Sequence, residues 1–166
     1  MSKVTDDLKA AFAGESQANR RYLAFARQAD KEGFPQIARL FRAAAHAETV
    51  HALNHLRALG EIKSTSENLQ AAIGGENYEV VSMYPAFIKD AEEEGSKQAL
   101  NSFRWAWEVE KVHEALYRKA LEASASGDAP EVEYYVCPIC GYTHEGPLAG
   151  KCPVCNTPGE KFERIG

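Results

Sequence analysis

The chain has 166 residues, of which 45% are hydrophobic and 26% charged, with a formal net charge of −5. This length suits one sizeable core plus a small appended domain. The acidic balance does not favour nucleic-acid binding, which typically uses a clustered basic surface. No run approaches the ~18 apolar residues of a membrane span, and the N-terminus lacks the apolar centre of a signal peptide. We therefore expect a cytoplasmic protein.

Apolar residues recur at helical spacing through most of the chain and predict four helices. The expected helices span residues 4–31, 36–59, about 67–94 and 97–124. Ser66 or Asn68 is expected to cap the third helix, and Pro85 to kink it. Gly and Pro residues between the helices supply stop and start signals. The pattern indicates two helical hairpins in succession.

The chain changes character after residue 124. Residues 125–133 are rich in Ser, Ala, Gly and Pro and predict a linker. Residues 134–166 are rich in Gly and Pro and contain all four cysteines. We therefore predict a helical domain over residues 1–124, a linker, and a small metal-binding domain over residues 134–166.

Two Glu-x-x-His units mark the second helix of each hairpin. Because three residues are close to one helical turn, the Glu and the His of each unit share a face. A further glutamate lies 33 or 34 residues upstream of each unit, so the ligand positions of a hairpin are level, ~24 Å from its turn. Such a set is typical of dinuclear iron or manganese carboxylate bundles. The predicted ligands are Glu15, Glu48, His51, Glu76, Glu110 and His113.

The alternative is that these glutamates are solvated surface residues. Against it, Glu15, Glu48 and Glu110 lie among alanines and apolar residues on faces assigned to the core, where an unpaired carboxylate is costly. Glu79 lies three residues after Glu76 and shares its face, so it is a further candidate ligand, with surface exposure as its alternative.

The two hairpins also resemble two copies of one unit. The Gly-Glu pairs that contain Glu15 and Glu76 are 61 residues apart, whereas the two Glu-x-x-His units are 62 apart. Tyr22 follows Glu15 by seven residues, and Tyr84 follows Glu76 by eight. Both tyrosines are either core residues or hydrogen-bond donors near the metals.

Two Cys-x-x-Cys pairs, separated by 11 residues, predict a tetrahedral thiolate site. Its ligands would be Cys137, Cys140, Cys152 and Cys155. Zinc ribbons and iron–thiolate centres share this spacing, so the pattern leaves the metal open.

With both motif sets in view, the chain resembles the rubrerythrin family over nearly its whole length. The resemblance implies a ferritin-like four-helix di-iron domain and a rubredoxin-like domain with one Fe(SCys)4 centre, hence three iron ions, with Mn or Zn as substitutes. By resemblance, Glu48 and Glu110 bridge the irons, Glu15 and Glu76 are terminal ligands, and His113 holds the second iron. Glu79 and His51 match the pair that exchanges at the first iron, and we class both, with Tyr22, as catalytic.

The resemblance implies reduction of hydrogen peroxide to water, with electrons that reach the di-iron site from the thiolate iron. The donor would be a rubredoxin or a NAD(P)H-dependent reductase. One alternative is a ferritin-like iron oxidase, and another is a binding module; either could carry a structural zinc-ribbon tail.

The short link between the second and third helices predicts a homodimer with exchanged hairpins. In a ferritin-like bundle these two helices are parallel, and the link must climb ~30 Å to bring Glu48 and Glu76 level. The eight steps from Leu59 to Glu67 span at most ~29 Å, without the sideways step between helices. An up-down-up-down bundle is the other solution. Exchange would bring Glu15, Glu48 and His51 of one chain to the other ligands in a second chain.

Overall fold

The structure is a computed structural model of the protein, and it describes residues 2–166. The chain forms two compact units, residues 1–63 and 64–166, and each is described by itself. Helices dominate both units, and a small antiparallel sheet ends the chain. The predicted fold class, mainly helical with a small C-terminal β domain, is confirmed. Within the described residues, no helix has both the length and the apolar composition to cross a membrane.

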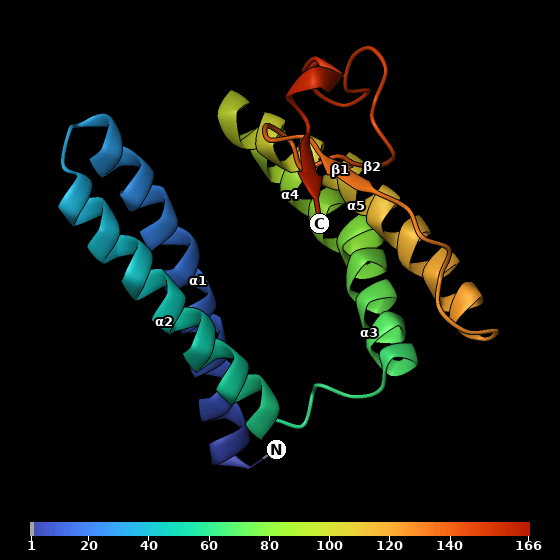
Figure 1. The fold of residues 1–166 in the computed structure, drawn as a ribbon, viewed down its shortest axis with the longest axis horizontal. Helices are drawn as coiled ribbons and strands as arrows, with labels where there is room; N and C mark the ends of the chain where they lie inside the picture. The colour runs from blue at the N-terminus through green and yellow to red at the C-terminus, as the bar shows by residue number, and fades with distance from the viewer. Residues whose placement is uncertain (1) are drawn as a thin grey trace. The chain divides into compact units, whose positions relative to one another are not determined.

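The first unit is a hairpin of two helices, α1 (Lys3–Lys31) and α2 (Pro35–Ala58), which lie side by side in Figure 1. Gly33 adopts a φ of +81° after α1, and the amide of Phe34 donates back to the carbonyl of Ala29 at 2.8 Å. This glycine-dependent C-cap ends α1, and Pro35 begins α2. Small residues then allow close approach of the helices, since Ala26, Ala29 and Ala38 are buried together.

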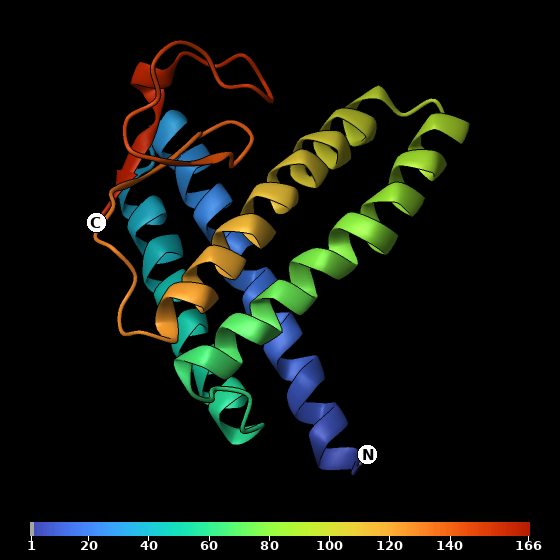
Figure 2. The ribbon, with the colours of Figure 1, turned by 90° about the vertical axis from the view of Figure 1, so that its right-hand side faces the viewer.

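The second unit begins with a longer hairpin. One arm contains α3 (Thr65–Tyr78), a π-helical turn η1 (Glu79–Met83) and α4 (Tyr84–Glu93). The other arm is α5 (Lys97–Ser124), and Figure 2 shows the two arms side by side. The cap of α3 is Ser64, in place of the predicted Ser66 or Asn68. Ser64 and Glu67 form a reciprocal capping box, which selects Ser64 among the neighbouring candidates.

The C-terminal part of the second unit is a three-stranded antiparallel sheet in the order β2-β1-β3. The strands are β1 (Tyr134–Val136), β2 (Thr143–Glu145) and β3 (Glu163–Ile165), and a short 3-10 helix, η2 (Gly159–Lys161), precedes β3. Buried Cys137, Cys152 and Phe162 form its core. Strand β2 lies against α5, where Lys119 Nζ pairs with Glu145 Oε2 at 2.7 Å.

Candidate metal centres

The first hairpin brings three of the predicted ligands together. Glu15 projects from α1, and Glu48 and His51 project from α2 one turn apart, so that their ligand atoms all lie within 4.8 Å of one another. His51 Nδ1 lies 2.8 Å from Glu48 Oε2. Both glutamates are half-buried, whereas 54% of the His51 side chain is exposed. The grouping fits half of a dinuclear carboxylate site.

The second hairpin brings together the three equivalent residues. Glu76 of α3 meets Glu110 and His113 of α5, again with all ligand atoms within 4.8 Å. His113 Nδ1 lies 2.7 Å from Glu110 Oε2 and 4.0 Å from Glu76 Oε1. His113 is more enclosed than His51, with 28% of its side chain exposed. Each hairpin thus supplies two carboxylates and one imidazole.

The electrostatics of the second group are those of a cation site. Burial, together with the nearby negative charge of Glu110, raises the pKa of Glu76 to about 7. Burial, followed by Glu110, also raises the pKa of Glu79. The hydrogen bond to Glu110 raises the pKa of His113, against the opposing effect of burial. Without a metal, the surroundings favour the protonated forms of these groups, and a bound cation would displace their protons.

The second hairpin differs from the first by one inserted residue. The tyrosine follows its glutamate by seven residues in α1 but by eight in the second hairpin. The α1 helix is unbroken, whereas the π-helical turn lies between Glu76 and Tyr84. A π-helical turn holds one more residue than an α-helical turn, so η1 accounts for the change in spacing. This turn begins at Glu79 and places that candidate ligand beside the second group.

Trp107 satisfies a backbone carbonyl that the π-helical turn leaves without its helical donor. The amide of Tyr84 donates to the carbonyl of Glu79, five residues back, and therefore passes over Val80. Pro85, the next residue, has no amide hydrogen to offer. Trp107 Nε1 of α5 donates to the Val80 carbonyl at 2.8 Å. The Trp107 ring also contacts Lys111 Nζ, 3.3 Å from its centroid.

The two tyrosines belong to equivalent aromatic clusters. Tyr22 contacts Phe25 and Phe41 with ring centroids 6.3 Å away in both cases. Tyr84 contacts the corresponding pair 62 residues later, Phe87 and Phe103, at 6.3 and 6.4 Å. Burial, and then the charges of Glu79, Glu110 and Glu76, raise the pKa of Tyr84, so its hydroxyl stays protonated and can donate a hydrogen bond. A catalytic role for Tyr22 stays a prediction.

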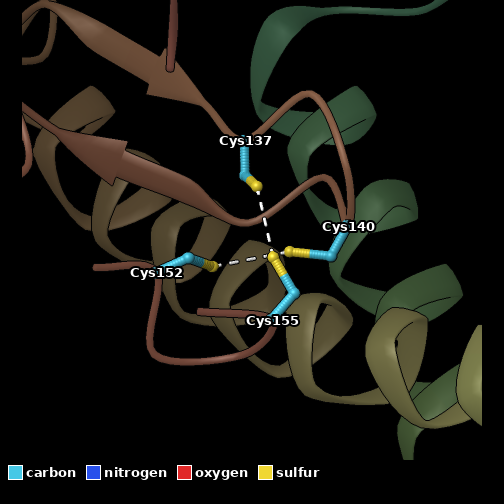
Figure 3. Close-up of side chains that lie close together, drawn as sticks. All are labelled: Cys137, Cys140, Cys152 and Cys155. Carbon is cyan, nitrogen blue, oxygen red and sulfur yellow. Dashed lines mark hydrogen bonds between the residues drawn. The ribbon is translucent and has the colours of Figure 1, made fainter. Parts of the chain in front are cut away.

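The four cysteines converge on one point, as Figure 3 shows. The Sγ atoms of Cys137 and Cys155 lie 3.5 Å apart, and those of Cys140 and Cys152 lie 3.6 Å apart. These distances far exceed a disulfide bond. They approach the ~3.8 Å edge of a tetrahedron with metal–sulfur bonds of ~2.3 Å. The cysteines are therefore arranged for a tetrahedral metal ion.

Each pair of cysteines lies on a similar turn. The amides of Gly141 and Asn156 donate to the carbonyls of Cys137 and Cys152, both at 3.0 Å, and both residues adopt a positive φ. Burial opposes ionisation of Cys155, but hydrogen bonds from Thr157, Cys140 and Cys137 together outweigh it and lower the pKa of this thiol to about 7. Such donors stabilise a metal-binding thiolate.

Comparison with known proteins agrees with both groups of motifs. The Rubrerythrin family model matches residues 6–121, and the model of the rubrerythrin rubredoxin-like domain matches residues 135–163. The chain belongs to the rubrerythrin family. It therefore carries a di-iron carboxylate type of ligand set and a four-cysteine rubredoxin-like site.

Members of this family match the chain almost end to end. Nigerythrin of Nitratidesulfovibrio vulgaris is 40% identical, over 98% of this chain and 86% of the relative. A rubrerythrin of Porphyromonas gingivalis is 41% identical, over 98% of this chain and 90% of the relative. The structure of fully reduced nigerythrin matches with a TM-score of 0.59 and 37% identity, over 99% of this chain and 88% of that chain.

Sequence reasoning did not find three residues that make hydrogen bonds close to the predicted ligands. Trp107 belongs to no motif of the sequence, and its bond to Val80 depends on side-chain packing between the two arms. Thr143 contacts His113, and no spacing rule relates these two residues. Asn19 is buried and donates to the carbonyl of Ala45 at 2.6 Å and to Thr49 Oγ1 at 2.9 Å, beside Glu48. Its position one turn after Glu15 was the available signal.

Proposed function

We propose that the protein is a peroxidase that reduces hydrogen peroxide to water at a di-iron site. The observation that carries this proposal is the presence of two different redox-capable ligand sets in one chain. Carboxylates and imidazoles suit iron or manganese that reacts with oxygen species, whereas four thiolates suit an iron ion that only transfers electrons. A family of oxidoreductases with this composition supports it.

The carboxylate site would bind two metal ions through side chains of both hairpins. Two iron ions would be held by Glu15, Glu48, His51, Glu76, Glu110 and His113, with Glu79 as an additional ligand. A pair of ferrous ions held there would supply the two electrons needed to cleave the oxygen–oxygen bond. The reaction consumes two electrons and two protons for each peroxide and yields two water molecules.

The remaining residues prepare the site for this reaction. Glu79 and the half-exposed His51 are the ligands with freedom to exchange, in line with the family resemblance. The Tyr84 hydroxyl, kept protonated by its surroundings, supplies a hydrogen-bond donor beside the carboxylates. The four thiolates would hold a third iron, which would supply one-electron transfer, and the proposed electron donor is a rubredoxin or a NAD(P)H-dependent reductase in the cytoplasm.

We further propose that the active form is a homodimer with exchanged hairpins. Glu48 lies ~15 Å from the end of α2 at Ala58, and Glu76 lies ~16 Å from the start of α3 at Thr65. The seven steps between these helix ends span at most ~25 Å, which is too short for the ~31 Å climb to a parallel α3. Exchange of hairpins between two chains removes this conflict and is a low-cost route to a dimer.

Metal analysis combined with anaerobic turnover tests the peroxidase proposal. The protein should contain three iron ions per chain and consume one peroxide for every two electrons supplied, with the visible absorption of an iron–thiolate centre. Two results together would contradict the proposal: a colourless four-cysteine domain that contains zinc, and turnover in which added ferrous iron is the only electron donor that works. That result would favour the ferritin-like iron oxidase.

A further inference from the structure

A hydrogen bond connects the rubredoxin-like domain to one of the proposed iron ligands. His113 Nε2 of α5 lies 2.9 Å from Thr143 Oγ1, at the start of β2. The opposite ring nitrogen, Nδ1, faces Glu110 Oε2 at 2.7 Å. The imidazole is therefore held at both nitrogens, and 28% of its side chain remains exposed.

The direction of this hydrogen bond follows from the second contact of Thr143. Its Oγ1 also lies 3.2 Å from the carbonyl oxygen of Gly141, which can only accept. A hydroxyl carries a single hydrogen, so Thr143 donates to Gly141 and accepts from His113. Nε2 of His113 therefore carries a hydrogen. In the neutral ring this leaves the lone pair on Nδ1, the nitrogen that faces the carboxylates.

The other half of the site provides an internal contrast. His51 Nδ1 also faces its own glutamate, at 2.8 Å. Among residues 2–166, however, the structure contains no hydrogen-bond partner for Nε2 of His51, and about half of that side chain is exposed. Within the described residues, His113 therefore has a hydrogen-bond partner at both ring nitrogens, whereas His51 has one at Nδ1 alone.

We propose that Thr143 is a positioning residue, which fixes the ring orientation and the Nε2–H tautomer of His113 so that Nδ1 binds the metal. A hydrogen-bond acceptor at the ring nitrogen that does not bind the metal orients a ligand histidine and raises its basicity. The anchor would keep His113 in place while His51 exchanges. It also links the carboxylate site to the Cys137–Cys140 turn, because Gly141 belongs to that turn.

This inference rests on the metal site of the proposed function but not on its reaction with peroxide. Three full-length variants test it. Thr143→Val preserves the shape of the side chain and removes the hydroxyl, and Thr143→Ser restores a hydroxyl. Lys119→Met removes the other polar contact with β2, at Glu145, and leaves His113 untouched, so it is the matched control for domain docking.

Two measurements distinguish positioning from general damage. The first is Co2+ titration of the carboxylate site in each variant, with the separate absorption of thiolate-bound metal as a check that the cysteine site is intact. The second is the ring Nε2–H signal of His113 in nitrogen-15 NMR spectra of the diamagnetic Zn2+-loaded protein. We expect Thr143→Val to bind Co2+ about 10–100-fold more weakly, the usual loss for an outer partner, and to lose the Nε2–H signal through exchange with water. Thr143→Ser and Lys119→Met should behave as the wild type.

The possible contrary results have different meanings. Wild-type affinity in Thr143→Val would overturn the role of Thr143 and leave the peroxidase proposal intact. An equal loss in Lys119→Met would also overturn it, since domain docking would then be the cause. Failure of the wild type to bind Co2+ at the carboxylates would overturn both proposals.

Discussion

Trp107 should stabilise the π-helical turn by its hydrogen bond to Val80, and replacement by Phe tests this. Phe fills most of the same space but has no N–H group, so the Val80 carbonyl loses its donor. Neither neighbouring backbone amide can replace the indole as donor to the Val80 carbonyl, because the amide of Tyr84 is bonded to Glu79 and Pro85 has no amide hydrogen. An unsatisfied buried acceptor costs ~1–3 kcal/mol. Since this bond is only partly buried, we expect Trp107→Phe to lower the free energy of unfolding by about 1–2 kcal/mol.

Urea unfolding of the metal-free protein, followed by circular dichroism, measures this loss. Trp105→Phe is the matched control, because the structure contains no hydrogen bond from its indole within residues 2–166. That variant should lose less than ~1 kcal/mol, in the range of ordinary side-chain truncations.

A double-mutant cycle with Pro85→Ala sharpens the test. Alanine at this position supplies an amide hydrogen within reach of the Val80 carbonyl, so Trp107→Phe should cost less in the Pro85→Ala background than in the wild type. Equal costs in both backgrounds, or equal losses for Trp105→Phe and Trp107→Phe, would refute the role that we assign to the indole.

Four other predictions concern the metal sites. Cys152→Ser should remove the metal of the thiolate site and leave the helical circular dichroism and the metal content of the carboxylate site unchanged; loss of both metals would show that the two sites are not separable. Metal affinity at the carboxylate site should rise steeply from pH 5 to 8 because Glu76 and His113 must release protons, and Glu76→Gln should flatten the profile. In the metal-free protein, the raised pKa of Glu76 means that the folded state holds its proton more tightly than the unfolded state does. The free energy of unfolding should therefore fall as the pH rises from the ordinary pKa of 4.5 to about 7. A refolded mixture of Glu48→Ala and Glu110→Ala chains should regain metal binding if the hairpins are exchanged, because one site of each mixed dimer is then intact; no recovery would exclude exchange.

Much of the helical fold could be predicted because its signals are local. Gly33 and Pro35 mark the first turn, and apolar residues at helical spacing mark the helices on either side. The two Glu-x-x-His units were predictive because helical geometry alone places Glu and His on one face. The boundary of the third helix does not follow from local signals alone, since Ser64, Ser66 and Asn68 are all capable caps, and only the capping box with Glu67 separates them.

Contacts between distant side chains were not predictable in the same way. The π-helical turn left a trace in the sequence, the spacing of eight between Glu76 and Tyr84, but one extra residue has many structural solutions. The bond from Trp107 to Val80 joins residues 27 apart, and that from His113 to Thr143 joins residues 30 apart. Both depend on how the arms and the sheet pack, which no local pattern determines.

The most direct test of the peroxidase proposal compares two oxidants. The fully reduced protein is mixed anaerobically with hydrogen peroxide, or separately with dioxygen at the same concentration, and reoxidation of both iron centres is followed by stopped-flow absorption. We predict that peroxide reoxidises the protein far faster than dioxygen does. Equal rates, or faster reoxidation by dioxygen, would contradict the proposal and indicate an oxidase.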